Sequence, residues 1–144
     1  MLVIARDGAL RRACAAEFHE ASVLRSGPLV TVDCATEEDR LARSLLGWSV
    51  RSHDAAVHPL WAAARGTLVL DRVTRLSADT QKLLHDFVRR ASAEAGAFGY
   101  GRLISMCETP PELAVERGEF SAALLDCLDK VRVTPRPQPW RGAA

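Results

Sequence analysis

Three residues in the chain have the types and surroundings that phosphate or metal chemistry requires. Asp71 directly follows Thr67–Leu70, a run of four strand-forming residues. A carboxylate at the carboxyl end of a buried strand is a common ligand for the Mg²⁺ of a bound nucleotide. Gly8 and Arg11 stand at the start of a predicted helix, where backbone N–H groups and a positive side chain can hold a phosphate. A nucleotide site formed by Gly8, Arg11 and Asp71 is therefore one hypothesis.

Asp71 and Arg11 also have a structural interpretation. Asp71 can cap the next turn, or pair with Arg72 or Arg75, and the pattern favours this role because Arg72 can neither accept a proton nor orient a water molecule. Arg11 is expected to be a solvated arginine in the first turn of its helix, although its charge then opposes the helix dipole.

Histidine and cysteine do not form a recognisable metal site. His53 and His58 can bind a metal as a pair, but no carboxylate or thiol lies at a supporting spacing, so surface or half-buried histidines are expected. No CxxC motif is present, and we expect buried free thiols at Cys14, Cys34, Cys107 and Cys127. No metal ligands are predicted.

The three tryptophans are candidate contact residues. Tryptophan is enriched at the centres of protein interfaces, which makes Trp48, Trp61 and Trp140 possible anchors for a protein partner. Core packing explains Trp48 and Trp61 equally well. Trp140 lies in a proline-spaced tail and is the better candidate for docking.

Composition restricts the class of protein. The 144 residues suit one compact domain, and the net charge of +1 with a pI of about 7.7 gives no global case for binding nucleic acid or an anionic membrane. The N-terminal apolar run Met1–Ile4 is too short for a signal peptide, and no apolar stretch is long enough to span a bilayer. We expect a cytoplasmic protein.

Strand-forming runs alternate with helical patterns along the chain. Strands are predicted at Leu2–Ala5, Leu29–Asp33, Thr67–Leu70, Leu103–Cys107 and Val131–Val133. Helices are predicted at Ala9–Ser22, at Thr36–Leu46 with Thr36 and Asp39 as a capping pair, from Ser77 as cap to Arg90, from Pro110-Pro111 to Gly118, and at Phe120–Leu128. The segment Gly47–Arg65 has no clear pattern of helix or strand.

Continuous apolar strands separated by helices predict a parallel sheet covered on both faces. The expected fold class is a three-layer α/β domain with a five-stranded parallel sheet. Its predicted extent is residues 1–134, and residues 135–144 form an extended proline-rich tail.

Taken in order, six segments resemble the AAA+ ATPase domain of bacterial enhancer-binding proteins, the activators of sigma-54. The segments are Phe18-His19-Glu20-Ala21-Ser22, Gly27–Val30 with Val32–Ala35, Leu45-Leu46-Gly47, Gly66–Asp71, Asp79 to Leu84, and Gly118-Glu119-Phe120 with Leu124 and Leu128. The resemblance implies a P-loop NTPase fold with strand order 5-1-4-3-2. It also makes Gly66–Asp71 the Walker B strand.

The resemblance fails at the positions that carry the family's chemistry. The Walker A segment Ala5–Arg12 keeps only Gly8, and Arg11 stands where the family has lysine. The other departures are Arg72 for the catalytic acid, Cys107-Glu108 for the γ-phosphate sensor, and Ser121 and Cys127 for the two arginine fingers. The loop that grips sigma-54 is missing between Gly47 and Gly66, and the lid is expected to be absent because the sequence ends at Ala144.

These departures predict a pseudo-ATPase, with no cofactor expected. We therefore expect a non-catalytic AAA+ core that acts by protein contact in bacterial transcription regulation. The partners implied are AAA+ activator subunits or further copies of the chain, without direct DNA binding. The alternative is a switch that binds ATP and Mg²⁺ weakly through Gly8, Arg11 and Asp71 without efficient hydrolysis. The residues offer no constellation for other enzyme chemistry, and they do not distinguish a regulator from a gene remnant.

Overall fold

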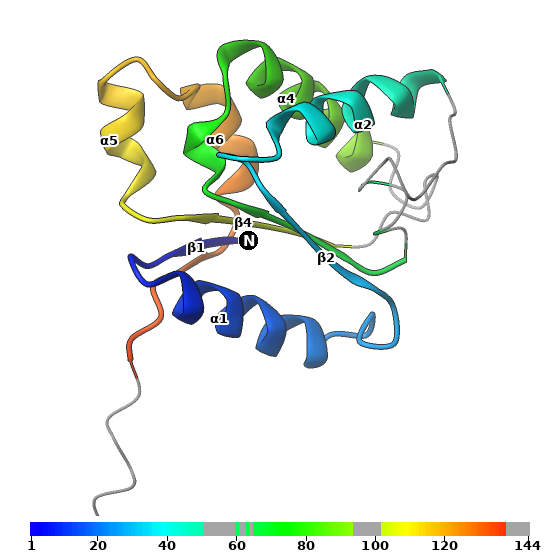
Figure 1. The fold of residues 1–144 in the computed structure, drawn as a ribbon, viewed down its shortest axis with the longest axis vertical. Helices are drawn as coiled ribbons and strands as arrows, with labels where there is room; N and C mark the ends of the chain where they lie inside the picture. The colour runs from blue at the N-terminus through cyan, green and yellow to red at the C-terminus, as the bar shows by residue number, and fades with distance from the viewer. Residues whose placement is uncertain (51–59, 61–62, 64, 94–101, 138–144) are drawn as a thin grey trace, which may run out of the picture.

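The computed structural model describes residues 1–50, 60, 63, 65–93 and 102–137 (Figure 1). Five parallel strands form one sheet in the order β2-β3-β4-β1-β5. The strands are β1 (Leu2–Ile4), β2 (Leu29–Asp33), β3 (Thr67–Asp71), β4 (Arg102–Cys107) and β5 (Arg132–Val133). The predicted parallel sheet and its strand order are confirmed.

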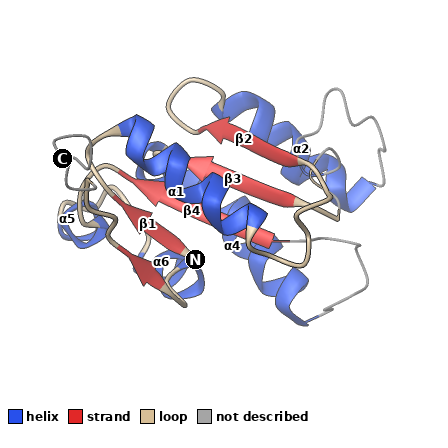
Figure 2. Ribbon diagram, turned by 90° about the horizontal axis from the view of Figure 1, so that it is seen from below, coloured by secondary structure: helices blue, strands red, loops and turns tan. Residues whose placement is uncertain are grey.

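Helices cover both faces of the sheet unequally. They are α1 (Gly8–Glu20), α2 (Glu38–Val50), the 3₁₀ turn η1 (Val73–Arg75), α4 (Ala78–Ala93), α5 (Pro111–Glu116) and α6 (Ala122–Leu128). Helix α1 lies on one face, and α2, α4, α5 and α6 lie on the other (Figures 1 and 2). The crossover from β1 to β2 runs one way along the sheet and the later crossovers run back. Because parallel crossovers are right-handed, α1 is placed on the opposite face from the later helices.

Apolar side chains fill both interfaces between sheet and helices. All five residues of the interior strand β3 are buried, as a parallel strand covered on both faces requires. Leu68 and Leu70 belong to the larger core beneath α2, α4 and α6, whereas Val69 belongs to the smaller core beneath α1. The alternation along β3 therefore places Asp71 on the same face as α1.

Short polar side chains set where several helices begin. Asp7 accepts a hydrogen bond from the N–H of Ala9 at 2.9 Å, and Ser121 accepts one from the N–H of Leu124 at 3.2 Å. Ser77 stands immediately before α4, as predicted, and its hydroxyl accepts from the N–H of Thr80 at 3.4 Å. Because Ser121 is the cap of α6, that helix begins after Phe120 and not at it.

The predicted cap of α2 is wrong. Residues 34–36 form a turn, and the helix begins at Glu38, two residues after Thr36. The carboxylate of Asp33 accepts from the N–H of Ala35 at 3.0 Å, and the carboxylate of Glu37 accepts from the N–H of Asp33 at 3.1 Å. These two bonds hold the chain in a turn before the helix starts.

Two glycines allow the segments before β2 and β3 to touch. A Cβ at Gly27 would lie 2.1 Å from the carbonyl oxygen of Arg65, and one at Gly66 would lie 2.0 Å from that of Pro28. The imidazole of His19 is buried at the same end of the sheet, with Nδ1 2.7 Å from Thr67 Oγ1 and Nε2 3.1 Å from the Gly27 carbonyl. This contact fixes the C-terminal end of α1 against the start of β3.

We predict that Gly66→Ala destabilises the fold strongly. The added methyl group would overlap the Pro28 carbonyl, so the backbone must shift, at a cost of about 3 kcal/mol. Thermal unfolding should show a midpoint lower by roughly 10 °C. Gly118→Ala is the matched control, because its φ of 73° strains an alanine but nothing lies within 4 Å of the new Cβ, giving a loss of only ~1 kcal/mol. Equal losses for the two variants would contradict the close-approach argument.

Candidate functional site

The candidate site lies where the parallel strands end on the α1 side of the sheet. The chain leaves β1 at Ala5, whose N–H donates to the carbonyl of Cys107, and enters α1 at Gly8. Asp71 ends β3, and Asp33 lies beside it in register at the end of β2. The sheet thus brings the β1–α1 loop and two carboxylates to one edge.

Arg11 is the central side chain of this edge. It extends from the first turn of α1 and is only 4% exposed. Its Nε donates to Asp71 Oδ1 at 2.8 Å, and its Nη2 donates to Asp71 Oδ2 at 3.4 Å. The planar guanidinium therefore faces the carboxylate with two parallel donors, the strong bidentate arrangement.

The same guanidinium also binds the loop that precedes α1. Its Nη1 donates to the carbonyl oxygens of Ala5 at 2.8 Å and Arg6 at 3.0 Å. A Cβ at Gly8 would lie 3.4 Å from Arg11 Nη2 and 3.0 Å from Arg12 Nη1, so a glycine leaves room for both guanidinium groups. The loop closes around an arginine of its own helix.

Asp71 has both carboxylate oxygens engaged. Oδ1 also accepts the backbone N–H of Arg72 at 2.9 Å, in addition to Arg11 Nε. The residue is 6% exposed. A buried carboxylate needs such a partner because its charge is costly to remove from water.

Arg72 points away from Asp71 towards the neighbouring strand. Its backbone is left-handed, with φ of 53°, an uncommon conformation for a residue with a Cβ. Its Nε donates to Asp33 Oδ1 at 3.0 Å and its Nη2 donates to Asp33 Oδ2. This hydrogen-bonded guanidinium holds the pKa of Asp33 below its ordinary value of 3.8, and the same pair raises the pKa of Arg72.

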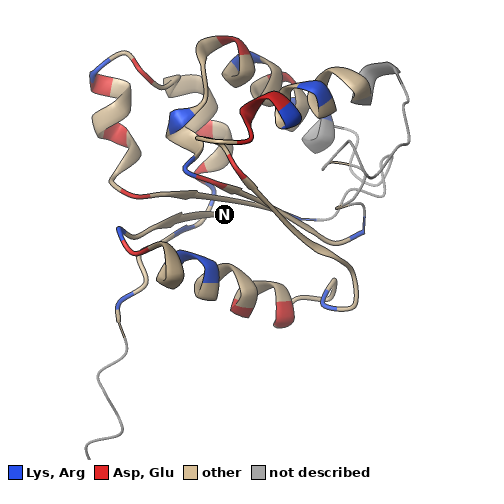
Figure 3. Cartoon of the chain, viewed as in Figure 1, with Lys and Arg blue, Asp and Glu red and all other residues tan. Residues whose placement is uncertain are grey.

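A third pair extends the row across the sheet. Arg75 of η1 lies 3.4 Å from the carboxylate of Glu108, which follows β4, and both side chains are exposed. With Arg11–Asp71 and Arg72–Asp33, three pairs of opposite charge therefore lie at the strand ends. In the view of Figure 3, basic and acidic residues are likewise interspersed and do not form a face of one sign.

The residues at this edge do not fit a nucleotide with Mg²⁺. A phosphate loop presents backbone N–H groups to an anion, but here two carbonyl oxygens face inward to a guanidinium. The carboxylate of Asp7 takes the N–H of Ala9, so an anion already stands at the N-terminus of α1. Asp71 has no oxygen free of a hydrogen bond for a metal. Within the described part of the chain, no cluster of three His, Cys, Asp or Glu side chains suits a metal ion.

The structure brings Gly8, Arg11 and Asp71 together, as the nucleotide-site hypothesis requires. The expectation of a solvated Arg11 is wrong, because the side chain is buried against Asp71. Asp71 has a structural partner, but the side chain it pairs with is Arg11 instead of Arg72 or Arg75. Sequence reasoning missed Asp33, although it ends β2 beside Asp71, and the neighbouring Arg72 was a signal for it.

The other candidate residues are placed less completely. Trp48 lies in α2, in a part of the helix where only the backbone is described. Trp61, Trp140, His53 and His58 lie outside the described residues. Cys14, Cys34 and Cys107 are buried free thiols as predicted, whereas Cys127 is half-buried. Burial raises the pKa of Cys107 to about 12 and also raises that of Cys34.

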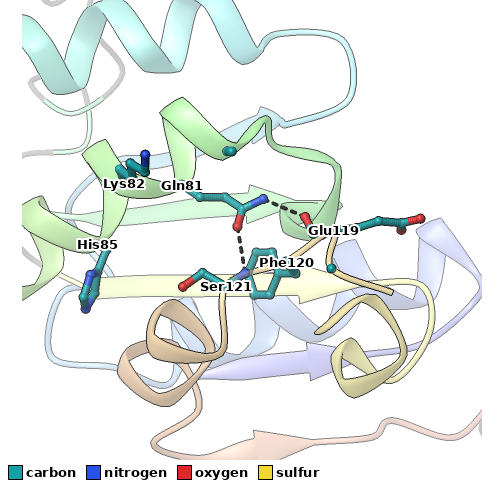
Figure 4. Close-up of a pocket in the computed structure, with 8 residues that line it drawn as sticks. Gln81, Lys82, His85, Glu119, Phe120 and Ser121 are labelled. Atoms are coloured by element: carbon teal, nitrogen blue, oxygen red, sulfur yellow. Dashed lines mark hydrogen bonds between the residues drawn. The ribbon is translucent and has the colours of Figure 1, made fainter. Parts of the chain in front are cut away.

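A small pocket lies between α4 and the connection from α5 to α6. It has a volume of about 250 Å³ and is lined by Ala78, Gln81, Lys82, His85 and residues 118–121 (Figure 4). Gln81, one of the lining residues, donates to the carbonyls of Leu76 and Glu119, both at 2.8 Å, and accepts from the N–H of Ser121 at 2.8 Å. Its amide is thus used to join α4 to the start of α6.

Comparison with protein families gives one match over most of the chain. The model of the sigma-54 interaction domain matches residues 1–134. No curated protein matches the chain by sequence. Among the described residues, none of the helices has the length and apolar character needed to cross a bilayer.

Solved structures share the fold. NtrX from Brucella abortus in complex with ADP has 25% identity and a TM-score of 0.73, covering 92% of this chain and 31% of NtrX. The complex of NtrX with ATP gives 25% identity, a TM-score of 0.70, and coverage of 92% and 32%. The P-loop NTPase domain of a sigma-54 transport activator from E. coli gives 17% identity, a TM-score of 0.65, and coverage of 96% and 84%. The chain therefore spans about a third of NtrX.

We predict that the Arg72–Asp33 pair stabilises the fold at neutral pH and not in acid. A carboxyl group whose pKa is lowered on folding contributes stability above its unfolded pKa, near 3.8, and loses it as pH falls through the lowered folded value. Arg72→Ala should therefore lower the free energy of unfolding by up to about 1 kcal/mol at neutral pH.

Urea unfolding of wild type and Arg72→Ala across this pH range measures the effect. The difference between the two proteins should shrink below pH 3.8 as Asp33 takes up a proton. Arg90→Ala, which removes an exposed pair with Asp86, is the control and should show little difference at any pH. A difference for Arg72→Ala that stayed constant with pH would rule out the ion pair as its source.

Proposed function

The chain belongs to the sigma-54 interaction domain family, and on this premise we propose that it is a non-catalytic AAA+ core that acts by protein contact in bacterial transcription regulation. The observation that carries the proposal is the buried pair of Arg11 and Asp71. It joins the two residues that would otherwise hold the phosphates and the metal. The proposed location is the cytoplasm.

Hydrolysis of ATP needs groups that the described residues of this edge do not offer. A phosphoryl-transfer site requires a metal beside the β- and γ-phosphates and a residue that orients the attacking water. The residue after Asp71 is Arg72, and its guanidinium is committed to Asp33. A guanidinium does not lose its proton in proteins, so it cannot serve as a base. These contacts support a role without catalysis.

The sheet and its helices support a role in binding another protein. The sheet has the strand order of its structural neighbours, and helices cover both of its faces. Such a core can meet the AAA+ subunits of an active transcription activator, or further copies of itself. We propose the activator subunit as the partner, since a core of the same fold without chemistry would interrupt a ring of active ones.

A second candidate function is a switch that binds ATP weakly without hydrolysing it. Gly8, Arg11 and Asp71 lie close enough together to support this alternative. NtrX has been solved with ATP and with ADP, and 25% of aligned residues are identical in this chain. The switch requires Arg11 to leave four hydrogen bonds when the nucleotide arrives. We therefore rank it second.

We predict that a purified AAA+ activator domain loses ATPase activity when this chain is added. The expected result is a dose-dependent loss of more than about half of the activator's rate at a small molar excess, because the activity of a ring depends on neighbouring subunits. Sedimentation of the mixture should show both proteins in one complex. An unchanged rate together with separate sedimentation of the two proteins would contradict the proposed contact.

Calorimetry distinguishes the two candidate functions. Titration of the chain with ATP and Mg²⁺ should give no saturable heat up to millimolar nucleotide. Saturable binding that Arg11→Ala abolishes, while Arg90→Ala leaves it unchanged, would favour the switch and contradict the proposal.

A further inference from the structure

We propose that the β1–α1 loop is a guanidinium-binding site and that Arg11 is its built-in ligand. The loop and Asp71 provide four acceptor contacts to this side chain, and all of them come from residues outside the helical turn that carries Arg11. The core is thereby held in one state that needs no nucleotide or metal. The site depends only on the contacts of Arg11 and not on whether the chain acts by protein contact.

The polarity of the loop identifies a cation as its ligand. The carbonyl oxygens of Ala5 and Arg6 point to Arg11 Nη1 at 2.8 and 3.0 Å. Asp71 adds a full negative charge from the opposite side. A loop that binds phosphate presents N–H donors instead, so the local field here is of the opposite sign.

The shape of the site identifies the cation as a guanidinium. One edge of the group, Nε and Nη2, meets the carboxylate of Asp71, and Nη1 meets the two carbonyls. The acceptors therefore match N–H donors that are fixed in one plane. A guanidinium group has such planar donors, and an ammonium group does not. The 4% exposure of Arg11 shows that the fit excludes solvent.

The two cations that follow Asp71 in the sequence are paired with other carboxylates. The closest cation along the chain from Asp71 is Arg72, which pairs with Asp33, and Arg75 pairs with Glu108. If Arg11 left, Asp71 would keep only the backbone N–H of Arg72 as a partner. An uncompensated buried carboxylate is strongly destabilising, so an incoming ligand must itself supply a cation of similar shape.

Chemical rescue tests this inference. Arg11→Ala removes the ligand and leaves its acceptors in place, and we expect a thermal midpoint lower by roughly 10 °C. Ethylguanidinium at tens of millimolar should then raise the midpoint by about 3 °C, as expected for a weak ligand of the folded state. Ethylammonium at the same concentration is the matched probe for charge without planar donors and should not raise it.

Arg90→Ala is the matched protein control. It removes an arginine from an exposed pair on α4, and neither compound should raise its midpoint or that of wild type. A rise of the Arg11→Ala midpoint that ethylammonium produces equally well, or no rise with ethylguanidinium, would overturn the proposed site.

Arg11→Lys keeps the inference testable if Arg11→Ala does not fold. Lysine keeps a charge for Asp71 but loses the planar donors that hold both loop carbonyls. Its midpoint should lie roughly 5 °C below that of wild type. A midpoint equal to wild type would overturn the site.

Nucleotide gives an independent readout. Millimolar ATP with Mg²⁺ should leave the wild-type midpoint within about 1 °C of its value in EDTA. Stabilisation by several degrees would overturn the inference, because the ligand would have displaced Arg11. Failure of the activator to bind this chain would instead contradict the proposed function alone.

Discussion

The ion pair between Arg11 and Asp71 is the interaction on which the carboxyl edge of the sheet depends. It joins α1, which covers one face, to the end of the interior strand β3, across 60 residues of sequence. Because Asp71 is buried on the α1 side, its charge must be met there, and the first turn of α1 supplies the cation. The position of the β1–α1 loop follows, since two of its carbonyls accept from Nη1 of the same side chain.

The pair also explains why a P-loop framework here has a different electrostatic design. In a nucleotide site, backbone N–H groups face phosphate oxygens and the strand-end carboxylate faces a metal. In this chain the strand-end carboxylates face arginines of the chain itself. Asp71 pairs with Arg11, and Asp33 pairs with Arg72. NtrX, which shares the fold, has been solved with ATP and with ADP, whereas here the fold carries ion pairs at the strand ends. Fold alone does not determine which chemistry a site supports.

The sequence was sufficient to predict the strands, their order and the cap of α4, because these depend on local apolar runs, on single polar residues and on a family resemblance. The burial of Arg11 was not predictable in the same way. A first-turn arginine is normally solvated, and the partner that reverses this lies 60 residues away, so the contact depends on strand register. The Arg72–Asp33 pair was easier to predict from the sequence, because β2 and β3 end side by side and Arg72 directly follows β3. The cap of α2 was missed since Asp33 and Glu37 form competing hydrogen bonds.

A buried ion pair is a poor means of stabilisation compared with apolar residues of similar volume, because both charges lose their hydration. What the pair adds is a geometric requirement. Four directional bonds to Arg11 are satisfied together only when α1 has one rotation and one distance relative to β3. A well-packed apolar side chain at position 11 would tolerate a range of both. The arginine therefore specifies the arrangement of α1, its loop and the sheet.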